Sequence, residues 1–253
     1  MQMSEFTLTT SDGVDLRARW HAPAGSSRTA IVLVHGFTGS MDHPEVIAVA
    51  EALAADGYDV ISYDARGHRG SGGFSTLGDA EHHDVAAAVR AASARYDHVV
   101  TVGASMGAIA ALRHAAATEP GLAGVVTISS PARWKLPRNV RAVLATALTR
   151  TRMGRRFAAR RLGVRIHPVW GNPPSPEEVA ALIRVPLAVI HGDADQMIPP
   201  SEAHRLAAAA RGPLRLHIVP GMRHAFAPAG IPAILASVRW ALAGGPPAAA
   251  TAG

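Results

Sequence analysis

A serine near the middle of the chain stands in a motif that is typical of activated nucleophiles, G-A-S-M-G at residues 103–107. An apolar segment that predicts a strand, residues 98–103, precedes it, and a helix is predicted over residues 106–117. A sharp strand-to-helix turn holds such a serine in a strained conformation, and small residues two positions away avoid clashes. The hydroxyl of Ser105 then lies at the carboxyl edge of a sheet, near the N–H groups that begin the helix. The motif therefore predicts a nucleophile at Ser105.

A serine hydroxyl needs a base to accept its proton, and in enzymes that base is usually a histidine. The chain contains 13 histidines, so position has to single one out. His224 lies in the loop after a predicted strand over residues 214–219, at the same edge of the sheet as Ser105. The loop after an earlier predicted strand offers two carboxylates that could orient His224, Asp193 and Asp195. The residues alone leave both aspartates open.

Strands and helices that would position these side chains alternate along the chain. Strands are predicted over residues 5–10, 14–20, 30–35, 58–63, 98–103, 123–129, 186–191 and 214–219. Helices are predicted over residues 44–55, 79–94, 106–117, 199–211 and 231–243. The first two strands flank a Ser-Asp-Gly turn and form a β-hairpin. The alternation predicts a mostly parallel sheet with helices on both faces.

Composition excludes several classes of protein. The 253 residues suit one large α/β domain, and 48% apolar with 17% charged residues rules out a mostly disordered chain. No run approaches 18 apolar residues, so no membrane-spanning helix is expected. The absence of cysteine excludes disulfides, thiol catalysis and cysteine-bound zinc. The first residues lack a secretory signal, and we expect a cytoplasmic location.

Positive charge is concentrated in one part of the sequence. The formal net charge is +6, from 25 basic and 19 acidic residues. Eleven of the basic residues lie within residues 131–165, which contain no aspartate or glutamate. The rest of the chain then has 14 basic residues against 19 acidic ones, so a basic insert interrupts an acidic body. No nucleic-acid partner is expected from this distribution. A solvated face, an anionic substrate and an anionic lipid surface remain open.

Taken together, these motifs resemble those of the α/β-hydrolase superfamily over residues 1–243. The resemblance rests on H-G-F at 35–37, Y-D-A-R-G-H at 63–68, G-A-S-M-G at 103–107, H-G-D-A-D-Q-M-I-P at 191–199 and G-M-R-H at 221–224. The family's H-G-x-x-D-x-x-[VI]-P pattern falls on the fourth of these, and it favours Asp195 over Asp193 as the acid of a triad. The order serine, aspartate, histidine along the chain is the one this fold uses.

The resemblance implies an α/β-hydrolase fold, with a mostly parallel central sheet, helices on both faces and a small helical lid. The lid would be the basic insert, at about residues 131–183, with helices over 139–150 and 152–162 that are apolar beneath. Residues 1–243 would form the hydrolase domain, followed by a disordered tail at 244–253.

The resemblance also implies a mechanism and a substrate class. A serine hydrolase would cleave a small-molecule carboxylic ester through an acyl-enzyme, with Ser105, Asp195 and His224 as the triad. The backbone N–H groups of Phe37 and Met106 would bind the oxyanion, and no cofactor or metal would be needed. Thioesterase and amide or peptide hydrolase activities remain alternatives on the same fold. A non-catalytic protein that binds a membrane or nucleic acid through the basic insert is the alternative of a different class.

The chain departs from the family pattern at one loop. The sequence D-A-R-G-H-R-G-S at residues 64–71 has Arg69 where the family usually has glycine. A positive φ at that position would be costly for arginine. We interpret this loop as structural, and we expect the same of His35 and His191, which each follow an apolar strand and precede a glycine. The adjacent His82 and His83 are expected to begin a helix rather than to bind a metal.

Overall fold

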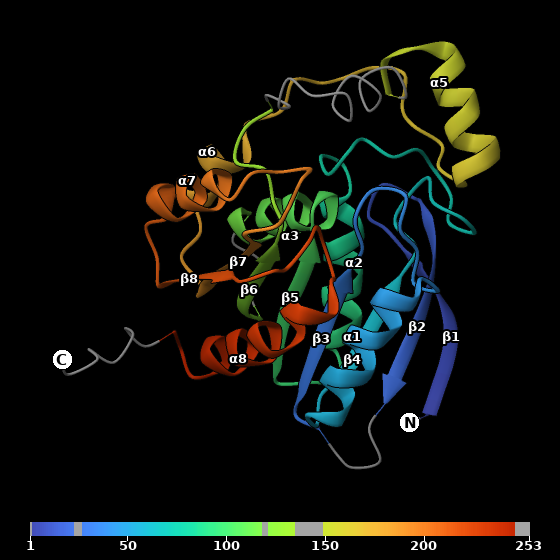
Figure 1. Cartoon of the computed structure of the whole chain (residues 1–253). Helices are drawn as coiled ribbons and strands as arrows, with labels where there is room; N and C mark the ends of the chain where they lie inside the picture. Colours follow the sequence, from blue (N-terminus) through green and yellow to red (C-terminus); the bar gives the residue numbers. More distant parts are fainter. Residues whose placement is uncertain (1, 23–26, 118–120, 135–148, 246–253) are drawn as a thin grey trace.

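The computed structural model describes residues 2–22, 27–117, 121–134 and 149–245. Within these ranges one sheet of eight strands runs through the molecule, in the order β1-β2-β4-β3-β5-β6-β7-β8 (Figure 1). The strands are β1 (Gln2–Thr9), β2 (Asp15–Ala22), β3 (Thr29–Val34), β4 (Asp59–Tyr63), β5 (His98–Ala104), β6 (Leu122–Ile128), β7 (Leu187–Gly192) and β8 (Leu214–Val219). The pairs β1·β2 and β2·β4 are antiparallel, and the five pairs from β4·β3 to β7·β8 are parallel. The predicted hairpin and the mostly parallel sheet are confirmed.

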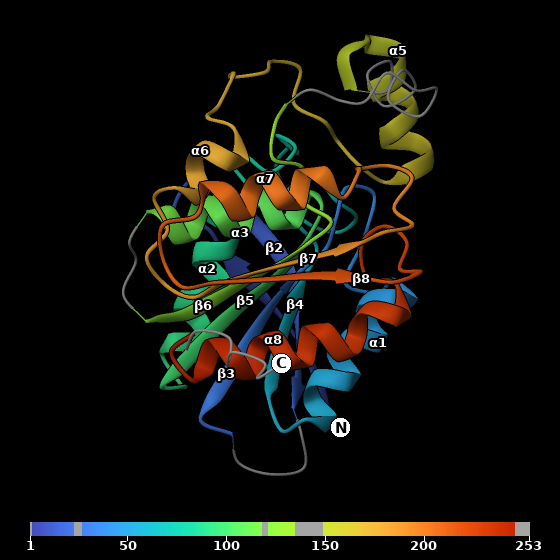
Figure 2. The same cartoon turned by 60° about the vertical axis from the view of Figure 1, so that its left-hand side comes forward.

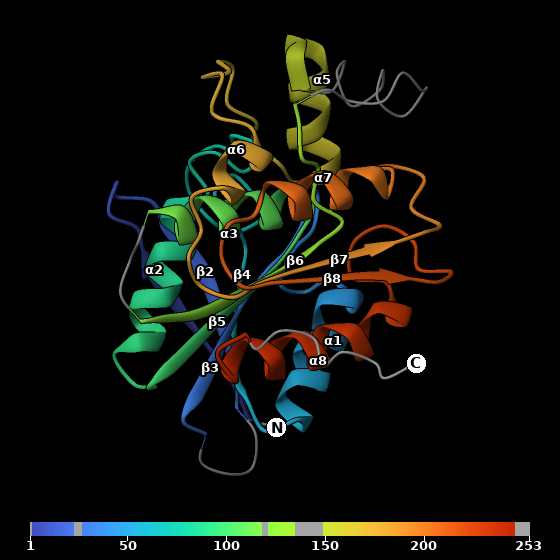
Figure 3. The same cartoon turned by 90° about the vertical axis from the view of Figure 1, so that its left-hand side faces the viewer.

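Helices cover both faces of the sheet, as Figures 2 and 3 show. The helices of the body are α1 (Pro44–Ala55), α2 (His82–Ser93), α3 (Met106–Ala116), α6 (Pro176–Ala180), α7 (Ser201–Ala209) and α8 (Ile231–Leu242). Helices α1 and α8 pack on one face, and α2, α3, α6 and α7 pack on the other. The sheet is therefore the middle layer of three, which is the arrangement that the alternating elements predict.

The central strands are apolar throughout because both of their faces are covered. Every residue of β3, β4 and β7 is buried. Successive side chains of a strand point to opposite faces, so Ile31 and Leu33 join the core beneath α1 and α8. Ala30 and Val32 join the core beneath α2 and α3 instead. Two apolar cores thus hold the parallel strands, whose carboxyl ends form one edge.

The segment between β6 and β7 contains the helical insert. Helix α5 (Arg152–Phe157) continues as a π-helical turn, η1 (Ala158–Leu162), which matches the helix expected at residues 152–162. Most of the helix expected at 139–150 lies outside the described residues, as does the tail from residue 246 onward. Helix α6 was not predicted, although its start carries a capping box of Ser175 and Glu178.

In the four described ranges no helix combines the length and apolar character needed to cross a bilayer. A cytoplasmic location stays a prediction.

Candidate active site

Ser105 lies in the turn between β5 and α3, as the motif predicts. Its backbone has φ 52° and ψ −113°, a conformation that is strained for any residue other than glycine. The Ser105 N–H donates to the carbonyl of Ile128, at the end of the neighbouring strand β6, at 2.8 Å. The turn therefore fixes Ser105, which is partly exposed, at the carboxyl edge of the sheet.

The two glycines of the motif are required by close backbone contacts. A Cβ atom added to Gly103 would lie 2.4 Å from the carbonyl oxygen of Gly107, across the turn. A Cβ atom added to Gly107 would lie 2.4 Å from the carbonyl oxygen of Val34, at the end of β3. Both distances are far below van der Waals contact, so only glycine fits, and this packing keeps the serine turn against β3.

His224 and Asp195 are in contact in the loops that follow β8 and β7. The Nδ1 atom of His224 lies 2.7 Å from Oδ2 of Asp195. The other carboxylate oxygen, Oδ1, accepts hydrogen bonds from the backbone N–H groups of Met197 and Ile198, at 2.8 and 3.0 Å. The carboxylate is buried, with 7% of the residue exposed. The acid therefore has a donor on each of its oxygens.

These contacts set the ionisation of Asp195 and the tautomer of His224. Burial acts to raise the pKa of Asp195, but the hydrogen bonds from His224 and from the Ile198 N–H outweigh it and lower the pKa to about 2. Asp195 is therefore ionised at neutral pH and accepts a hydrogen from Nδ1 of His224. In the neutral imidazole this leaves Nε2 as the free acceptor, which is the tautomer a general base needs.

Asp193, the other carboxylate of the β7 loop, has a different environment. It is exposed, and its Oδ1 accepts the N–H of Gly221 at 2.7 Å. This bond ties the β7 loop to the loop that carries His224. Of the two aspartates that the sequence left open, Asp195 contacts His224 and Asp193 braces the loop.

The end of β6 connects the serine turn to the histidine loop. Ile128 accepts the N–H of Ser105, and its neighbour Ser129 accepts the N–H of Ala225 through its hydroxyl at 3.1 Å. Ser129 has φ 50° and Ala225 has φ 63°. The sequence analysis missed Ser129, because a positive φ at a serine or an alanine leaves no sign in the residue type.

Phe37 lies in the loop after β3, and Met106 follows Ser105 directly in the chain. A Cβ atom added to Gly36 would lie 3.2 Å from the carbonyl oxygen of Ala104 and 3.4 Å from Cβ of Ser105, so the loop after β3 runs against the serine turn. Met106 is the first residue of α3. In the described part of the chain neither amide has a hydrogen-bond acceptor, so both remain available to a ligand.

The histidines interpreted as structural do bind loop backbone. His35 is fully buried, its Nε2 accepts the N–H of Ala65 at 3.0 Å, and its Nδ1 contacts the Gly36 carbonyl at 2.8 Å. Burial lowers the pKa of His35 to about 3, so the ring is neutral. Nε2 of His191 contacts the carbonyl of Ile198 at 2.9 Å. Both rings fix loops of the site and neither contacts Ser105.

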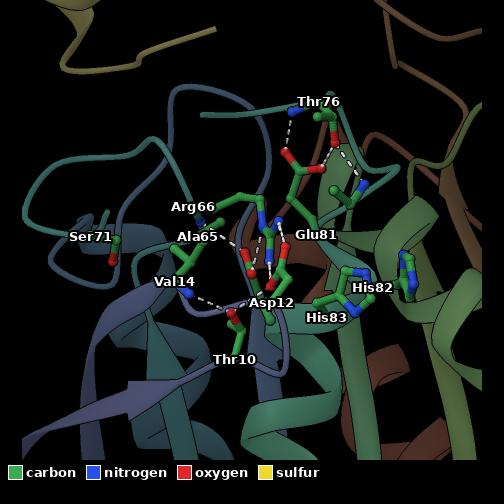
Figure 4. A network of polar contacts seen from close by, with 12 residues as sticks. Thr10, Asp12, Val14, Ala65, Arg66, Ser71, Thr76, Glu81, His82 and His83 are labelled. Atoms are coloured by element: carbon green, nitrogen blue, oxygen red, sulfur yellow. Dashed lines mark hydrogen bonds and ion pairs between the residues drawn. The ribbon is translucent and has the colours of Figure 1, made fainter. Parts of the chain in front are cut away.

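The loop at residues 64–71, the arginine-glycine loop, is held by a network of ion pairs around the buried Arg66 (Figure 4). Arg66 donates from its backbone N and from Nε to the carboxylate of Asp84, each at 2.8 Å, and from its terminal nitrogens to Asp12 at 2.7 and 2.9 Å. Arg69 has φ 43°, in the region that favours glycine. Its N–H donates to the carbonyl of Gly163 in the insert at 2.8 Å. These bonds are what a structural loop requires.

The segment of the insert that follows η1, residues 164–167, is hydrogen-bonded to the arginine-glycine loop and to Ser75 after it. Arg165 donates its N–H to the carbonyl of Gly67 and accepts the N–H of Ser75, both at 2.7 Å, and His167 donates to Ser75 at 2.8 Å. Val164, Ile166 and Ala158 are buried and pack, with Leu162, against the side chain of Phe37. The insert therefore packs against Phe37, in the loop that runs against the serine turn.

The described residues contain no cluster of side chains that could bind a metal ion. In the ranges that the structure describes, no three histidine, aspartate or glutamate side chains come close enough to hold an ion. His82 contacts the carbonyl of Asp79 at 2.6 Å, and His83 contacts the hydroxyl of Ser11 at 3.2 Å. These two rings serve the start of α2.

Comparisons with known proteins agree with this architecture. A relative in Bacillus subtilis strain 168, the uncharacterized protein YqkD, is 28% identical over 242 residues, which is 89% of this chain and 74% of that protein. Among solved structures, the Pyrococcus furiosus esterase Pf2001 superposes with a TM-score of 0.71 at 21% identity, over 95% of this chain and 90% of that one. The esterase domain of a Rhodothermus marinus protein gives 0.65 at 25% identity, over 96% and 98%. The sequence model of the alpha/beta hydrolase family matches residues 31–236, and the chain belongs to that family.

Proposed function

We propose that the protein is a serine hydrolase that cleaves carboxylic esters of small molecules through an acyl-enzyme. One observation carries the proposal: a serine in a strained strand-to-helix turn shares a sheet edge with a histidine bonded to a buried, ionised aspartate. This combination has no evident structural purpose, since the strain at Ser105 costs stability. It is the arrangement that nucleophilic catalysis requires.

In the proposed reaction the Ser105 hydroxyl attacks the ester carbonyl carbon while Nε2 of His224 accepts its proton. The C–O bond to the alcohol then breaks, and His224 returns the proton to the leaving alkoxide. A water molecule repeats these two steps on the acyl-enzyme, releasing the acid and restoring the Ser105 hydroxyl. Asp195 keeps the required tautomer of His224 and stabilises the imidazolium that forms.

The two free amides beside Ser105 are the proposed oxyanion hole. Negative charge develops on the carbonyl oxygen in the tetrahedral intermediate, and the N–H groups of Phe37 and Met106 would donate to it. Loss of one such donor typically costs about 3–4 kcal/mol of transition-state stabilisation. The N-terminal end of α3 adds a favourable field at the same place.

We further propose that the helical insert is a lid over the acyl side of the site. Its support is the apolar cluster in which Val164 and Ile166 pack against Phe37. A short or medium apolar acyl group would contact this cluster once the carbonyl is held by the Phe37 amide. The esterase Pf2001 and the Rhodothermus esterase domain share this fold, which favours this substrate class.

Thioesters and amides use the same steps and remain alternatives at this site. They are distinguished by the leaving group alone, so turnover of matched substrates decides between them. The non-catalytic alternative predicts that no ester, thioester or amide turns over. It leaves the strain at Ser105 and the Asp195–His224 contact without a purpose.

The test is hydrolysis of p-nitrophenyl esters from acetyl to palmitoyl. We expect wild-type turnover with an optimum in chain length, and loss of about three orders of magnitude or more in Ser105→Ala. Ser237→Ala is the matched control, because it removes a buried hydroxyl without a partner on α8. Wild-type turnover that persists in Ser105→Ala would refute the serine mechanism.

A further inference from the structure

The outer face of helix α5 combines positive charge with exposed apolar side chains. Arg152 and Arg156 lie four residues apart, as do Met153 and Phe157, so each pair shares one row of the helix. Met153 is 83% exposed and Phe157 is 54% exposed. All four side chains are at the surface, while Ala158 of the following turn faces the body and is buried. An arginine row and an apolar row therefore run side by side in solvent.

The charge of this segment is uncompensated. Arg150, Arg152, Arg156, Arg160 and Arg161 form no ion pair within the described chain, and residues 131–165 contain no acidic residue at all. Like charges four residues apart on a helix destabilise it. An anionic surface would relieve this repulsion. The unpaired arginines therefore favour a binding partner with negative charge.

A groove beside α5 is lined by positive charge that could bind a phosphate group. It has a volume of about 320 Å³, and its lining includes Arg152, Arg155, Arg156, Arg165 and Phe74. None of its lining residues is acidic. Arg165 is already bonded to the carbonyls of Gly73 and Ser71, so it is held in place within the groove wall. Guanidinium groups bind phosphate oxygens in a planar fork, and Phe74 adds an apolar surface that is 52% exposed.

The exposed apolar side chains favour an anionic lipid surface over nucleic acid or an acidic protein as the partner. Nine large apolar side chains are exposed in the described residues, and five of them lie in the insert or in the loop beneath it: Phe74, Met153, Phe157, Val169 and Trp170. Leu182 lies at the end of the insert, and Met3, Met197 and Leu214 lie elsewhere. Nucleic acid and acidic proteins would be met by the arginines alone and would leave Met153 and Phe157 in water. Basic residues beside exposed apolar ones are the pattern of helices that lie in the interface of an anionic membrane.

We propose that the outer face of α5, with Phe74 and the adjoining groove, docks on an anionic phospholipid surface. The arginines would contact headgroup phosphates, and Met153 and Phe157 would enter the boundary between headgroups and acyl chains. Figure 1 shows α5 projecting at the end of the molecule toward which the parallel strands run, and Ser105 stands at that same end of β5. Docking would therefore turn the proposed catalytic edge toward the bilayer, although binding itself does not depend on the proposed reaction.

The experiment is sedimentation with sucrose-loaded vesicles, using phosphatidylcholine alone or with about one third phosphatidylglycerol. The wild type should bind the anionic vesicles at least tenfold more strongly than the neutral ones, and high salt should weaken that binding. The triple variant Arg152→Gln, Arg156→Gln, Arg160→Gln should lose roughly 100-fold, at about fivefold for each arginine. The matched control is Arg90→Gln, Arg184→Gln, Arg211→Gln, which removes three exposed charges elsewhere and should stay within threefold of wild type.

Two further variants separate the lipid surface from other partners and from catalysis. Met153→Ser with Phe157→Ser keeps every charge and should lower vesicle binding at least tenfold, because the apolar contribution is lost. Ser105→Ala should bind vesicles like the wild type. Equal binding to neutral and anionic vesicles would overturn the proposal, and so would equal losses in the two triple variants. Full vesicle binding by the Met153 and Phe157 variant would indicate a general polyanion site and would also overturn it.

Discussion

Replacing Asp195 by asparagine tests the proposed triad through the tautomer of His224. Oδ1 of Asp195 accepts two backbone N–H groups, so in Asp195→Asn the amide oxygen is expected to keep that position. The amide NH2 group then faces Nδ1 of His224, at the place where Oδ2 accepts now. Nδ1 would have to become the acceptor, and Nε2 would carry the hydrogen. In that tautomer His224 cannot take the proton of Ser105.

The expected loss in Asp195→Asn is about 10⁴-fold in kcat, because the wrong tautomer removes the base while the geometry survives. That loss corresponds to about 5 kcal/mol. Asp193→Asn is the matched control, since an asparagine oxygen can still accept the N–H of Gly221. It should change kcat less than about threefold. Both variants are assayed on the best p-nitrophenyl ester, with circular dichroism to verify folding. A larger loss in Asp193→Asn than in Asp195→Asn would refute the assignment.

Three other predictions follow from the same contacts. Because the pKa of Asp195 is lowered to about 2, Asp195 should stay ionised down to about pH 4, so its protonation should add nothing to the pH dependence of kcat/KM above that pH and the slope of log kcat/KM should not exceed one; a slope of two would mean that Asp195 also titrates. Burial lowers the pKa of native His35 to about 3. Between about pH 6.5 and pH 3 the unfolded chain therefore binds a proton that the native chain does not, and the free energy of unfolding decreases as the pH is lowered. Urea unfolding should show that His35→Gln reduces this dependence by about 1.4 kcal/mol per pH unit, whereas an unchanged slope would contradict a neutral His35. Gly107→Ala should lower the free energy of unfolding by about 3 kcal/mol or more, because its Cβ would lie 2.4 Å from the Val34 carbonyl; Gly171→Ala meets only ordinary contacts, and equal thermal stability of the two variants would contradict the packing.

Local sequence signals predicted the sheet and the serine turn. The apolar runs of β3, β4 and β7 are visible because these strands are buried on both faces. The glycines of the serine motif are visible because no other residue fits the close backbone approaches at Gly103 and Gly107. In both cases the structural constraint acts on residue type, so the sequence has to show it.

Contacts between distant loops were harder to predict. Asp193 and Asp195 are two residues apart and chemically identical, so the residues alone left both open; the resemblance to the family pattern favoured Asp195, which contacts His224 in the structure. The bonds that attach Arg165 to Gly67 and Ser75 join backbone groups, and backbone groups are the same for nearly every residue. The docking of the insert on the arginine-glycine loop therefore left no pattern to find.

In the basic insert, composition showed where the arginines are concentrated in the sequence, but it did not show which of them are exposed. Arg152 and Arg156 of α5 are exposed, whereas Arg155 and Arg165 are half-buried, and Arg165 is bonded to the carbonyls of Ser71 and Gly73. Charge counting treats these arginines alike. Their roles separate only when burial and hydrogen bonds are known.

The most direct test of the central claim is to trap the acyl-enzyme on Ser105. The protein is mixed with a p-nitrophenyl ester, quenched in acid within the first turnover, and analysed as intact protein and as peptides by mass spectrometry. The proposed mechanism predicts one acyl group per chain, on the peptide that contains Ser105, and none in Ser105→Ala. Turnover without any adduct, or an adduct at another residue that persists in Ser105→Ala, would contradict it.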